Sequence, residues 1–586
     1  MLTLNRLKLF AAVLALLALV ACGGGGSSNT PSPTPTASGQ KLTAQVFDTV
    51  TGDIFDAVVG VQRIRYRVAG IHAPRDTECY ADQSLQASTE LLVGEIIEVE
   101  DAPGPEEDGA RPAYVTLNGA PIDERLVADG MARVSPGLPG GAPPEERLTT
   151  LEAQAKAAGK GLWGSCIVAP FGFTAEAFVS GIENPTVMAF APDGRMFVGT
   201  KGGKVWVVSA EGVRSDQPFV DLSEEVNGQA DRGLLGLALD PDFSTNGYVY
   251  LLYTVDRVPG EPDEDADTPA YGRLTRYTEL AGAADPASRV ILIGNGPADG
   301  FPIAAITHTI GTLVFGPNRE LFVSAGDGAV DTLPDVGHGT TDRDIMFSAM
   351  FPPSEDIGAL RAQSLDSLDG KILRINPDTG GGLESNPFWT GDPLANRSRV
   401  WAYGMRNPFR ITLRTTAAGA ESFFVGDVGN KKWEEISIAT AGANLGWPCY
   451  EGPDLEPLFA ATPQAADVCN AVAPGGFTPP TFYYPNAATG DLGTAGFSGT
   501  AVVAGAVYTG KSFPADYDGS FFFTDLSGGF LKILDVGPDG SLLDVRDFAT
   551  GLQTAVDVLM HPETGDLYLA EIAANEIVRI KYVGPG

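Results

Sequence analysis

Beyond residue 166, apolar residues come in short stretches that alternate with turns rich in proline and glycine. An apolar stretch, a Pro-x-Gly or Pro-Asp turn and a second apolar stretch recur at residues 190–199, 239–253, 315–328, 375–380, 536–542 and 560–571. Strand pairs that repeat in this way over hundreds of residues, without helical periodicity, are typical of a β-propeller. The uneven spacing predicts long insertions between strands. Residues 576–580 are predicted to close the ring beside the strand near Phe171.

Residues 41–166 follow a different pattern. Two segments place apolar residues at helical spacing, 81–93 and 145–158, and three short segments are strand candidates, 63–68, 95–99 and 113–117. This mixture predicts a small β-barrel with packed helices. We therefore expect a mainly β chain with a first domain at 41–166 and a larger one at 167–586.

The first 40 residues do not have the pattern of a folded domain. Arg6 and Lys8 precede an apolar run at residues 9–20, which is too short to span a bilayer as a mature helix and suits a secretory signal. The run ends in Leu-Val-Ala-Cys22, which resembles the lipobox of bacterial lipoproteins; an ordinary signal peptide with an incidental cysteine is the alternative. Residues 23–40, rich in Gly, Ser, Pro and Thr, are expected to be a flexible tether. We expect Cys22 to carry a lipid that holds the protein at the bacterial cell envelope, and Gly23 favours the outer membrane.

Charge limits the possible partners. The chain has 39 Lys+Arg and 74 Asp+Glu, a net charge of −35. A protein this acidic repels phosphate backbones, which disfavours nucleic-acid binding. Residues 41–166 alone carry 11 basic and 20 acidic residues, and no later segment is apolar and long enough to cross a membrane.

Four cysteines remain if Cys22 carries lipid, and they allow three pairings. Cys79 with Cys166 and Cys449 with Cys469 is the pairing that stays within the two expected domains. An oxidising compartment would keep both disulfides closed. Free buried thiols are the alternative.

The first domain contains three segments, residues 65–75 (RYRVAGIHAPR), 113–134 and 152–164, that resemble the staphylococcal-nuclease family, an OB-fold barrel. The resemblance implies that Asp53 is a retained calcium ligand and that Arg67 is the phosphate-binding arginine. Arg111, displaced by one position, would be the remnant of a second arginine. However, His72 stands where the other calcium aspartate is expected, and Arg75 where the general base is expected.

Those two replacements remove the chemistry of a nuclease. Phosphodiester hydrolysis needs a base that activates water and a metal that offsets charge on the phosphate. A cation at the position of the base can do neither. We predict that the domain lacks nuclease activity and serves for binding or spacing.

The second domain carries more specific motifs, at residues 231–243 (DRGLLGLALDPDF), 308–328, 368–380, 384–388, 400–413 and 426–452. Together they resemble the soluble glucose/sorbosone (aldose sugar) dehydrogenase family, six-bladed propellers that use pyrroloquinoline quinone (PQQ) and calcium. Within this family, the chain is most similar to the hedgehog-interacting-like branch. The resemblance implies hydride transfer from C1 of a sugar to the quinone.

The resemblance also assigns catalytic and cofactor-binding residues. His308 matches the base that takes the proton of the sugar hydroxyl, with a turn histidine of structural role as the alternative. Arg406 matches the arginine that contacts the cofactor, a role that suits its fork of donors; a structural arginine paired with an acid at 427 or 435 is the alternative. Asp231 and Asn407 complete the expected cofactor-binding set.

Calcium is expected on the segment that follows. The resemblance places two ligating backbone carbonyls at Gly429 and Asn430, with acidic support from Asp427, Glu434 and Glu435. Oxygen ligands of this kind suit calcium.

Other positions depart from the family. The expected glutamine before Gly-Leu-Leu-Gly is an Asp-Arg pair at 231–232, and residues 521–533 and 551–562 contain no arginine to neutralise the three carboxylates of the cofactor. Two functions are therefore compatible with the sequence. The first is an envelope-anchored PQQ-dependent sugar dehydrogenase, and the second is a non-catalytic, calcium-dependent propeller that binds a glycan or a protein. Several Lys or Arg side chains converging on His308 and Arg406 would favour the first, and a carboxylate-lined mouth the second.

Overall fold

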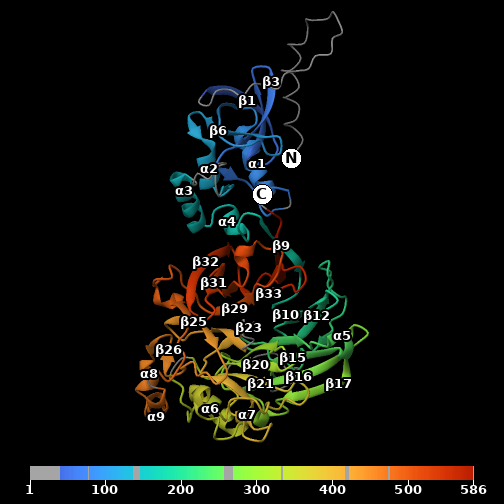
Figure 1. The fold of residues 1–586 in the computed structure, drawn as a ribbon, viewed down its shortest axis with the longest axis vertical. Helices are drawn as coiled ribbons and strands as arrows, with labels where there is room; N and C mark the ends of the chain where they lie inside the picture. Colours follow the sequence, from blue (N-terminus) through green and yellow to red (C-terminus); the bar gives the residue numbers. More distant parts are fainter. Residues whose placement is uncertain are drawn as a thin grey trace, which may run out of the picture.

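A computed structural model describes residues 40–76, 78–135, 145–256, 268–331, 334–415, 421–472 and 475–584. The chain forms a small N-terminal domain that lies above a larger ring-shaped domain (Figure 1). The predicted signal peptide, Cys22 and most of the tether lie outside the described residues. In the described ranges, no helix has both the length and the apolar character needed to cross a membrane.

The first domain is a closed β-barrel with helices around it. Its sheet has the order β3-β2-β1-β5-β6-β7, and a parallel pairing of β3 with β6 closes it. The strands are β1 (Lys41–Thr49), β2 (Ile54–Val59), β3 (Gln62–Val68), β5 (Ile96–Asp101), β6 (Arg111–Leu117) and β7 (Ala120–Pro121), with a separate pair of β4 (Ile71–His72) and β8 (Arg133–Val134). The helices are α1 (Ala81–Leu92), α2 (Ile122–Ala128), α3 (Glu146–Ala157) and α4 (Leu162–Ser165). The five segments predicted from sequence are confirmed, each within two residues.

The second domain is a propeller of six antiparallel blades, as expected. Blade 1 consists of β10 (Pro185–Phe190), β11 (Met196–Thr200), β12 (Lys204–Val208) and β13 (Val220–Asp221), and blade 2 of β14 (Leu234–Leu239), β15 (Tyr248–Val255), β16 (Ala270–Leu280) and β17 (Ala283–Ile293), with β18 (Phe301–Ile303) on β16. Blade 3 consists of β19 (Ile310–Phe315), β20 (Leu321–Ala325), β21 (Lys371–Ile375) and β22 (Val400–Tyr403), and blade 4 of β23 (Pro408–Thr415), β24 (Glu421–Asp427), β25 (Trp433–Ala439) and β28 (Phe482–Pro485). Blade 5 consists of β29 (Val502–Val507), β30 (Phe521–Asp525), β31 (Phe530–Val536) and β32 (Leu542–Thr550), and blade 6 of β33 (Ala555–Met560), β34 (Leu567–Glu571), β35 (Glu576–Tyr582) and β9 (Phe173–Ser180). The last blade joins the two ends of the propeller, because β35 pairs with β9 from Glu576–Ser180 to Tyr582–Phe173. This confirms the predicted closure.

Insertions between the strands carry short helices. They are α5 (Phe243–Asn246), α6 (Asp342–Met350), α7 (Asn396–Arg399), α8 (Pro457–Ala460) and α9 (Pro463–Ala471), the 3-10 helices η1 (Pro297–Asp299), η2 (Gly358–Gln363), η3 (Ala487–Thr489) and η4 (Ala515–Tyr517), and the small hairpin β26 (Tyr450–Glu451) with β27 (Asp454–Leu455). The longest of them lie in blades 3 and 4, next to the residues singled out above.

One arginine fills the centre of the ring. Arg410 on β23 is 2% exposed, and its guanidinium donates to the carbonyls of Val556 (3.0 Å), Leu235 (2.9 Å) and Thr186 (2.5 Å). These carbonyls belong to blades 6, 2 and 1, so a single side chain ties four blades together. Burial lowers the pKa of Arg410 and raises the pKa of Asp557, which lies 3.6 Å away.

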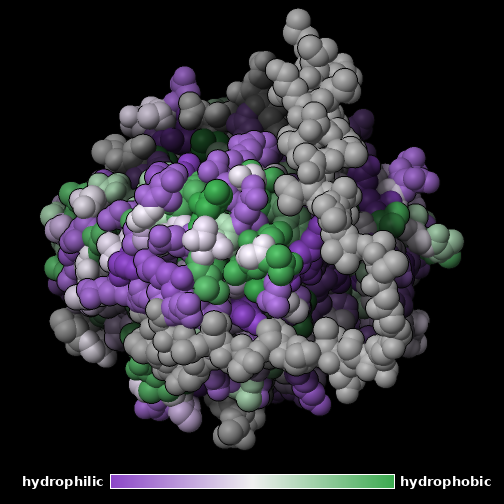
Figure 2. Space-filling view, turned by 90° about the horizontal axis from the view of Figure 1, so that it is seen from above, coloured by the Kyte–Doolittle hydropathy of each residue, from purple (hydrophilic) through white to green (hydrophobic). Residues whose placement is uncertain are grey.

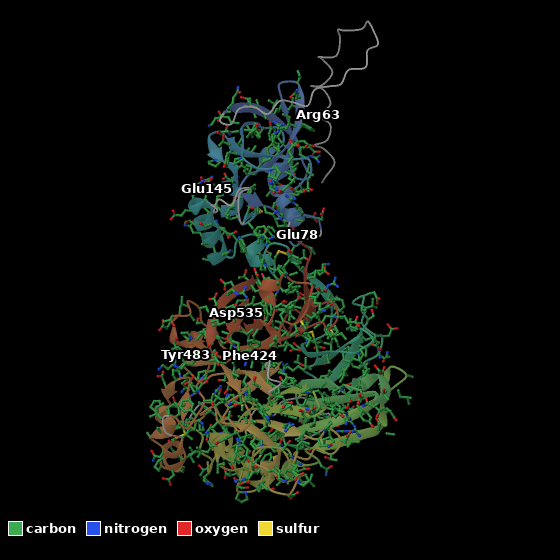
Figure 3. All side chains as sticks on the ribbon, in the orientation of Figure 1. Arg63, Glu78, Glu145, Phe424, Tyr483 and Asp535 are labelled. Atoms are coloured by element: carbon green, nitrogen blue, oxygen red, sulfur yellow. A yellow bond between two sulfur atoms is a disulfide. The ribbon has the colours of Figure 1, made fainter. Side chains whose placement is uncertain are left out.

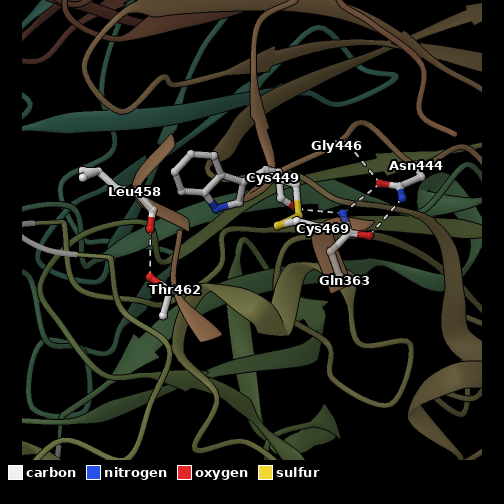
Figure 4. The surroundings of a disulfide bond; sticks show 8 residues. Gln363, Asn444, Gly446, Cys449, Leu458, Thr462 and Cys469 are labelled. Atoms are coloured by element: carbon white, nitrogen blue, oxygen red, sulfur yellow. Dashed lines mark hydrogen bonds between the residues drawn. A yellow bond between two sulfur atoms is a disulfide. The ribbon is translucent and has the colours of Figure 1, made fainter. Parts of the chain in front are cut away.

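Both predicted disulfides are confirmed. Cys79 binds Cys166 at the base of the first domain, and Cys449 binds Cys469 in the insertion of blade 4. Figure 4 shows the second disulfide with Leu458 and Thr462 on one side and the Gln363–Asn444 pair on the other. The first disulfide holds the end of the barrel domain just before the linker, and the second holds α9 against the turn that leads into β26.

The linker between the domains is fixed at several points. Val168 exchanges two backbone hydrogen bonds with Thr550 (2.8 and 3.1 Å). Arg133 donates to the carbonyl of Ala169 at 2.7 Å and lies over the ring of Phe171, 4.2 Å from its centre. In Figure 3, Glu78 lies at the side of the barrel that faces the propeller. The two domains are therefore in contact around the linker.

Candidate functional site

Blade 3 brings a histidine and an aspartate together. His308, in the turn before β19, is buried, and its Nδ1 lies 3.0 Å from Oδ1 of Asp327, which follows β20. The other carboxylate oxygen of Asp327 accepts the indole N–H of Trp447 at 2.7 Å. Burial alone would raise the pKa of Asp327, but the contacts with His308 and the charge of Arg406 outweigh it and lower that pKa. A histidine whose Nδ1 is held by an ionised aspartate keeps Nε2 for another partner, which is the geometry of an oriented general base.

Asp231 holds the backbone of the turn that carries His308. Its carboxylate accepts the backbone N–H of His308 at 3.4 Å, and its carbonyl accepts the hydroxyl of Thr309 at 2.7 Å. His308 has a φ of +52°, in the left-handed region that non-glycine residues rarely adopt. The structure places Asp231 as the residue that holds this turn, and not on the cavity beside the histidine.

Arg406 also lines the space beside His308, and one of its donor atoms, Nη1, is already in use. Its Nη1 donates to the carbonyls of Val428 (3.0 Å) and Gly429 (2.6 Å), and its guanidinium lies 5.5 Å from the ring centre of Trp447. The Nε atom has no hydrogen-bond partner among the residues that the structure describes. Neither expected pairing of this guanidinium with an acid at 427 or 435 is present; the partners are backbone carbonyls.

The residues expected to bind calcium face other groups. Asp427 accepts the backbone N–H of Arg406 (3.1 Å) and of Asn407 (2.6 Å), so Asn407 acts through its backbone. Burial raises the pKa of Asp427 to about 7. The carbonyl of Gly429, an expected calcium ligand, accepts from Arg406 instead.

Two further acids are turned toward backbone amides. Glu434 accepts from the backbone of Val502 (3.0 Å) and Gly429 (3.3 Å) and from the Asn486 side chain (2.8 Å), and Glu435 accepts from Gly452 (2.5 Å). Burial raises the pKa of Glu434 to about 7 and that of Glu435 well above its usual range. Across the described ranges, no three His, Cys, Asp or Glu side chains are arranged to hold a metal ion. In this arrangement the residues do not fit calcium.

Asn430 begins a turn whose backbone is held by the side chain of Glu451, a contact that was not predicted from the sequence. One carboxylate oxygen of Glu451 accepts the backbone N–H groups of four successive residues, 430 to 433, at 2.8 to 3.2 Å. A carboxylate held by several N–H groups is strongly stabilised. Glu451 therefore fixes the loop that carries Gly429 and Asn430.

The space beside His308 is small. It measures about 10 Å³, enough for about one water molecule. Its lining includes Arg406, Asn430, Lys431 and Trp447, and the side chains of Leu458 and Phe459 from the insertion. Phe459 packs edge-on against Trp447, with ring centres 5.4 Å apart. A tricyclic quinone with three carboxylates does not fit here, because Leu458 and Phe459 fill the space and only Arg406 and Lys431 carry a permanent positive charge among the described lining residues.

A larger cavity, whose lining includes several charged side chains, adjoins this space, and we refer to it as the α6 cavity. It measures about 230 Å³ and shares Val330 and Pro334 with the space beside His308. Its remaining lining is formed by Ala304, Asp335, Val336, Gly337, Gly339, Thr341, Arg343, Asp344, Phe347, Asp356, Gly358 and Arg361. The carboxylates of Asp335 and Asp356 accept nearby backbone N–H groups at 2.9 to 3.1 Å, which holds the loop around the cavity.

Two arginines of the α6 cavity have unused donors. Arg361 is 1% exposed; it donates to the carbonyls of Asp327 (3.0 Å) and Glu355 (2.8 Å), and its Nη2 has no partner among the described residues. The same is true of Nε of Arg343. Buried donors without a partner are costly. Arg361 therefore links the α6 cavity to the His308–Asp327 pair through its hydrogen bond to the carbonyl of Asp327.

The barrel has its own remnant of a site. The guanidinium of Arg75 lies between Asp53 (3.3 Å) and Asp108 (2.8 Å), so a cation of the protein occupies the side of the retained aspartate. His72 packs edge-on against Phe171, and burial lowers the pKa of His72. Arg67 binds Glu107, and Arg111 lies near Glu106. These contacts agree with the predicted loss of nuclease chemistry, and its absence remains a prediction.

Sequence reasoning found His308 and Arg406, which lie on one cavity with Asn430. It missed Asp327, Trp447, Glu451 and Arg361. Asp327 could have been found, because it ends a buried strand in the motif Ser-Ala-Gly-Asp-Gly, where polar groups reach the end of a blade. No local signal marks Arg361, whose role depends on how η2 folds over blade 3.

The chain is thus a six-bladed propeller with a histidine–aspartate pair at the end of one blade. The sequence profile of the glucose/sorbosone dehydrogenase family matches residues 182–579, so the chain belongs to this family. The profile of the staphylococcal nuclease homologues matches residues 65–165. Both expected resemblances are confirmed.

Relatives of known name are distant. HIPL2 protein of Arabidopsis thaliana is 25% identical over 409 residues, which cover 60% of this chain and 52% of the relative. Quinoprotein glucose dehydrogenase B of Acinetobacter calcoaceticus is 25% identical over 288 residues, 48% of this chain and 53% of the relative. The chain thus spans about half the length of these relatives. The crystal structure of soluble aldose sugar dehydrogenase from Escherichia coli, in the apo-form, matches with a TM-score of 0.50 and 21% identity over 70% of this chain and 99% of the other, which shows the shared fold.

Proposed function

We propose that the propeller binds a neutral sugar or a related polyol in the α6 cavity, beside the His308–Asp327 pair, and that it does so without a quinone. The observation that carries this proposal is the pair of buried arginine donors without a partner, Nη2 of Arg361 and Nε of Arg343, in a cavity that also contains carboxylates. A hydroxyl group both donates and accepts, so a polyol can satisfy arginines and aspartates together.

The size of the α6 cavity supports a small ligand. Its volume of about 230 Å³ lies just below the range of about 300–1,000 Å³ that is usual for drug-sized ligands, which suits a ligand of monosaccharide size. The ring of Phe347 lies 5.2 Å from Arg361 and gives the cavity an apolar wall for the C–H face of a sugar. The family relation adds that named relatives act on glucose, as in quinoprotein glucose dehydrogenase B.

The proposal departs from the family in the role of the quinone. The space beside His308 has room for about one water molecule, and the carbonyl of Gly429 already accepts a hydrogen bond from Arg406. His308 and Asp327 then serve as a polar pair that orients a hydroxyl, with His308 accepting or donating through Nε2. A quinone-dependent oxidation needs the insertion that carries Leu458 and Phe459 to move away.

Calorimetric titration of aldoses and polyols into the full chain tests the proposal. We expect saturable binding without added PQQ, lost in Arg343→Met. Arg374→Met is the matched control, because Arg374 also has an unpartnered Nε among the described residues but lies outside the α6 cavity. Equal binding by the wild type and Arg343→Met would refute the placement in this cavity. Saturable PQQ binding with sugar-dependent dye reduction would establish the dehydrogenase function instead.

We also propose that Cys22 carries a lipid that anchors the protein at the cell envelope. The support is the sequence that ends in Leu-Val-Ala-Cys22, followed by the Gly/Ser-rich segment. Labelling with a palmitate analogue in the native host should mark the wild type and leave Cys22→Ala unmarked. A wild-type protein that stays unlabelled while it is exported would refute the anchor.

A further inference from the structure

Apolar side chains lie exposed on one end of the barrel. Val61, in the turn between β2 and β3, is 98% exposed, and Ile96, the first residue of β5, is 62% exposed. Phe47 on β1 is 39% exposed, although it carries a whole aromatic ring. We refer to Phe47, Val61 and Ile96 as the distal patch. Single apolar residues on a surface are common, whereas several on one face can mark an interaction site.

Strand pairing brings the distal patch together. Gln45 on β1 pairs with Val58 on one side and with Ile96 on the other, and Val58 pairs with Arg63. Directly opposed residues of antiparallel strands point to the same face of a sheet, so Ile96 and Arg63 share the outer face of the barrel. The guanidinium of Arg63 lies over the ring of Phe47, 4.8 Å from its centre. The patch therefore surrounds one arginine.

The distal patch points away from the propeller. In Figure 3, Arg63 lies at the far end of the barrel, and Glu78 lies at the side that faces the propeller. Figure 2 looks down on the far end and shows an apolar area bordered by hydrophilic side chains. This end of the barrel is thus free of the propeller and open to an external partner.

The chain enters the barrel beside this patch. β1 begins at Lys41, which precedes Gln45 by about 13 Å along the strand. Residues 23–40 connect Lys41 to Cys22, the residue proposed above to carry a lipid. A chain of that length, rich in Gly, Ser, Pro and Thr, spans about 20–25 Å on average. A bilayer that holds the lipid therefore lies within reach of the distal patch.

The charges near the patch suit lipid headgroups. Residues 60–65 contain two arginines and no acid, although the whole chain has a net charge of −35. On the neighbouring strands, Lys41 and Glu98 offset each other at 3.3 Å. Arg63 has no ion pair among the residues that the structure describes. An arginine whose stem covers an aromatic ring can leave the ring among acyl chains while its cation reaches the phosphates.

We propose that the distal patch rests on the lipid bilayer that anchors the chain, with its apolar side chains at the acyl boundary and Arg63 at the headgroup phosphates. This inference rests on the lipid anchor proposed for Cys22. Weak contacts are sufficient, because a short tether keeps the patch at an effective concentration of the order of millimolar. Since the linker fixes the barrel to the propeller, docking would hold the propeller away from the bilayer in one orientation.

A fluorescent probe at the hairpin tip tests the proposal. In the full, anchored chain, Val61→Cys leaves one free thiol, because Cys22 carries lipid and the other four cysteines form two disulfides. The environment-sensitive fluorophore NBD is attached there, in vesicles of phosphatidylethanolamine with a minor share of phosphatidylglycerol. We expect doxyl-labelled lipid to quench this probe at least about threefold more than the same probe in Val213→Cys. Val213 is the matched control, because it is 65% exposed and lies between β12 and β13 of the propeller.

A second pair of variants separates docking from mere nearness to the membrane. With the probe at residue 61, Ile96→Asn should reduce the quenching by about half or more, because a polar side chain then replaces part of the apolar contact. Ile345→Asn is the control, since Ile345 on α6 is 61% exposed, close to the 62% of Ile96, and should leave the quenching unchanged. If Ile96→Asn does not fold, Phe47→Ser should give the same loss. Equal quenching in all of these variants would overturn the proposal.

Three further outcomes would also overturn it, each for a different reason. A wild-type chain that incorporates no palmitate analogue has no anchor, so both this inference and the proposal for Cys22 would be wrong. An anchored chain whose probe at residue 61 is quenched no more than the probe at residue 213 would keep the anchor and refute the docking alone. A blue shift at residue 61 that grows with protein density and ignores the lipid quencher would assign the patch to a second copy of the chain.

Discussion

In both domains, an arginine contacts a residue that the family resemblance assigns to calcium. In the barrel, Arg75 pairs with Asp53 at 3.3 Å and with the exposed Asp108. In the propeller, Arg406 is buried and donates to the carbonyl of Gly429 at 2.6 Å. The two arginines differ in their surroundings: the first belongs to a partly exposed ion-pair network, and the second is part of the core. A guanidinium beside an expected calcium ligand can therefore form part of a surface ion-pair network or fix a loop inside the fold.

The two domains also contain one disulfide each, and removing either should strongly lower stability. Cys79–Cys166 closes a sequence separation of 87 residues and Cys449–Cys469 one of 20. By the chain-entropy relation, removing the first as C79S/C166S should cost about 4.6 kcal/mol, and removing the second as C449S/C469S about 3.3 kcal/mol. We expect the first change to unfold the barrel and the second to loosen the insertion while the blades stay folded. Urea unfolding followed by domain-resolved hydrogen exchange measures both losses of stability. A larger loss in C449S/C469S than in C79S/C166S would contradict the prediction.

The next effect is expected at the centre of the propeller. Arg410→Met removes donors to carbonyls on three blades and leaves the buried Asp557 without its cation. Breaking such a buried pair costs about 3–5 kcal/mol. Arg65→Met in the barrel is the control, because Arg65 pairs with Asp56 at an exposed position and should cost at most about 1 kcal/mol. Thermal unfolding that gave equal losses would show that the centre of the ring does not depend on Arg410.

Much of this fold could be predicted from the sequence because its signals are local. Turn motifs marked the blades, helical spacing marked α1 and α3, and cysteine spacing suited the disulfides. His308 and Arg406 were found through motifs of the family. The calcium site was expected at Gly429 and Asn430 by the same route, but a motif does not show that a neighbouring guanidinium satisfies the carbonyl.

Long-range packing explains the rest. Arg410 acts on residues 146 to 224 positions away, and Arg75 meets Asp108 across 33 positions. No periodicity in the sequence records such contacts. The replacement of the general base by Arg75 was visible, whereas the contact of Arg406 with the carbonyl of Gly429 needed the distances. The closing of the space beside His308 by Leu458 and Phe459 also depends on how an insertion folds back.

A smaller, pH-dependent effect should distinguish the propeller from the barrel. Burial raises the pKa of Glu434 to about 7, above its value in an unfolded chain. Between about pH 4.5 and 7 the folded state then keeps a proton that the unfolded state has released, so stability is largest at low pH and falls as the pH rises. From pH 5 to 7 the loss should be roughly 2 kcal/mol for this group. Glu434→Gln should remove that part of the slope in pH-dependent urea unfolding, and an unchanged slope would contradict the assignment.

The smallest effect is expected from calcium itself, and it tests the comparison most directly. In the barrel Arg75 occupies the open side of Asp53, and in the propeller the carbonyl of Gly429 and the carboxylates around it already accept N–H groups. A ligand stabilises a fold only as far as its concentration exceeds its dissociation constant. Millimolar calcium should therefore shift the melting of either domain by less than about 1 °C in differential scanning calorimetry, with magnesium as the control for ionic strength. A clear calcium-induced rise in the melting temperature of the propeller alone would mean that the carbonyls of Val428 and Gly429 leave Arg406 and bind the ion. Only the arginine of the barrel would then keep calcium out.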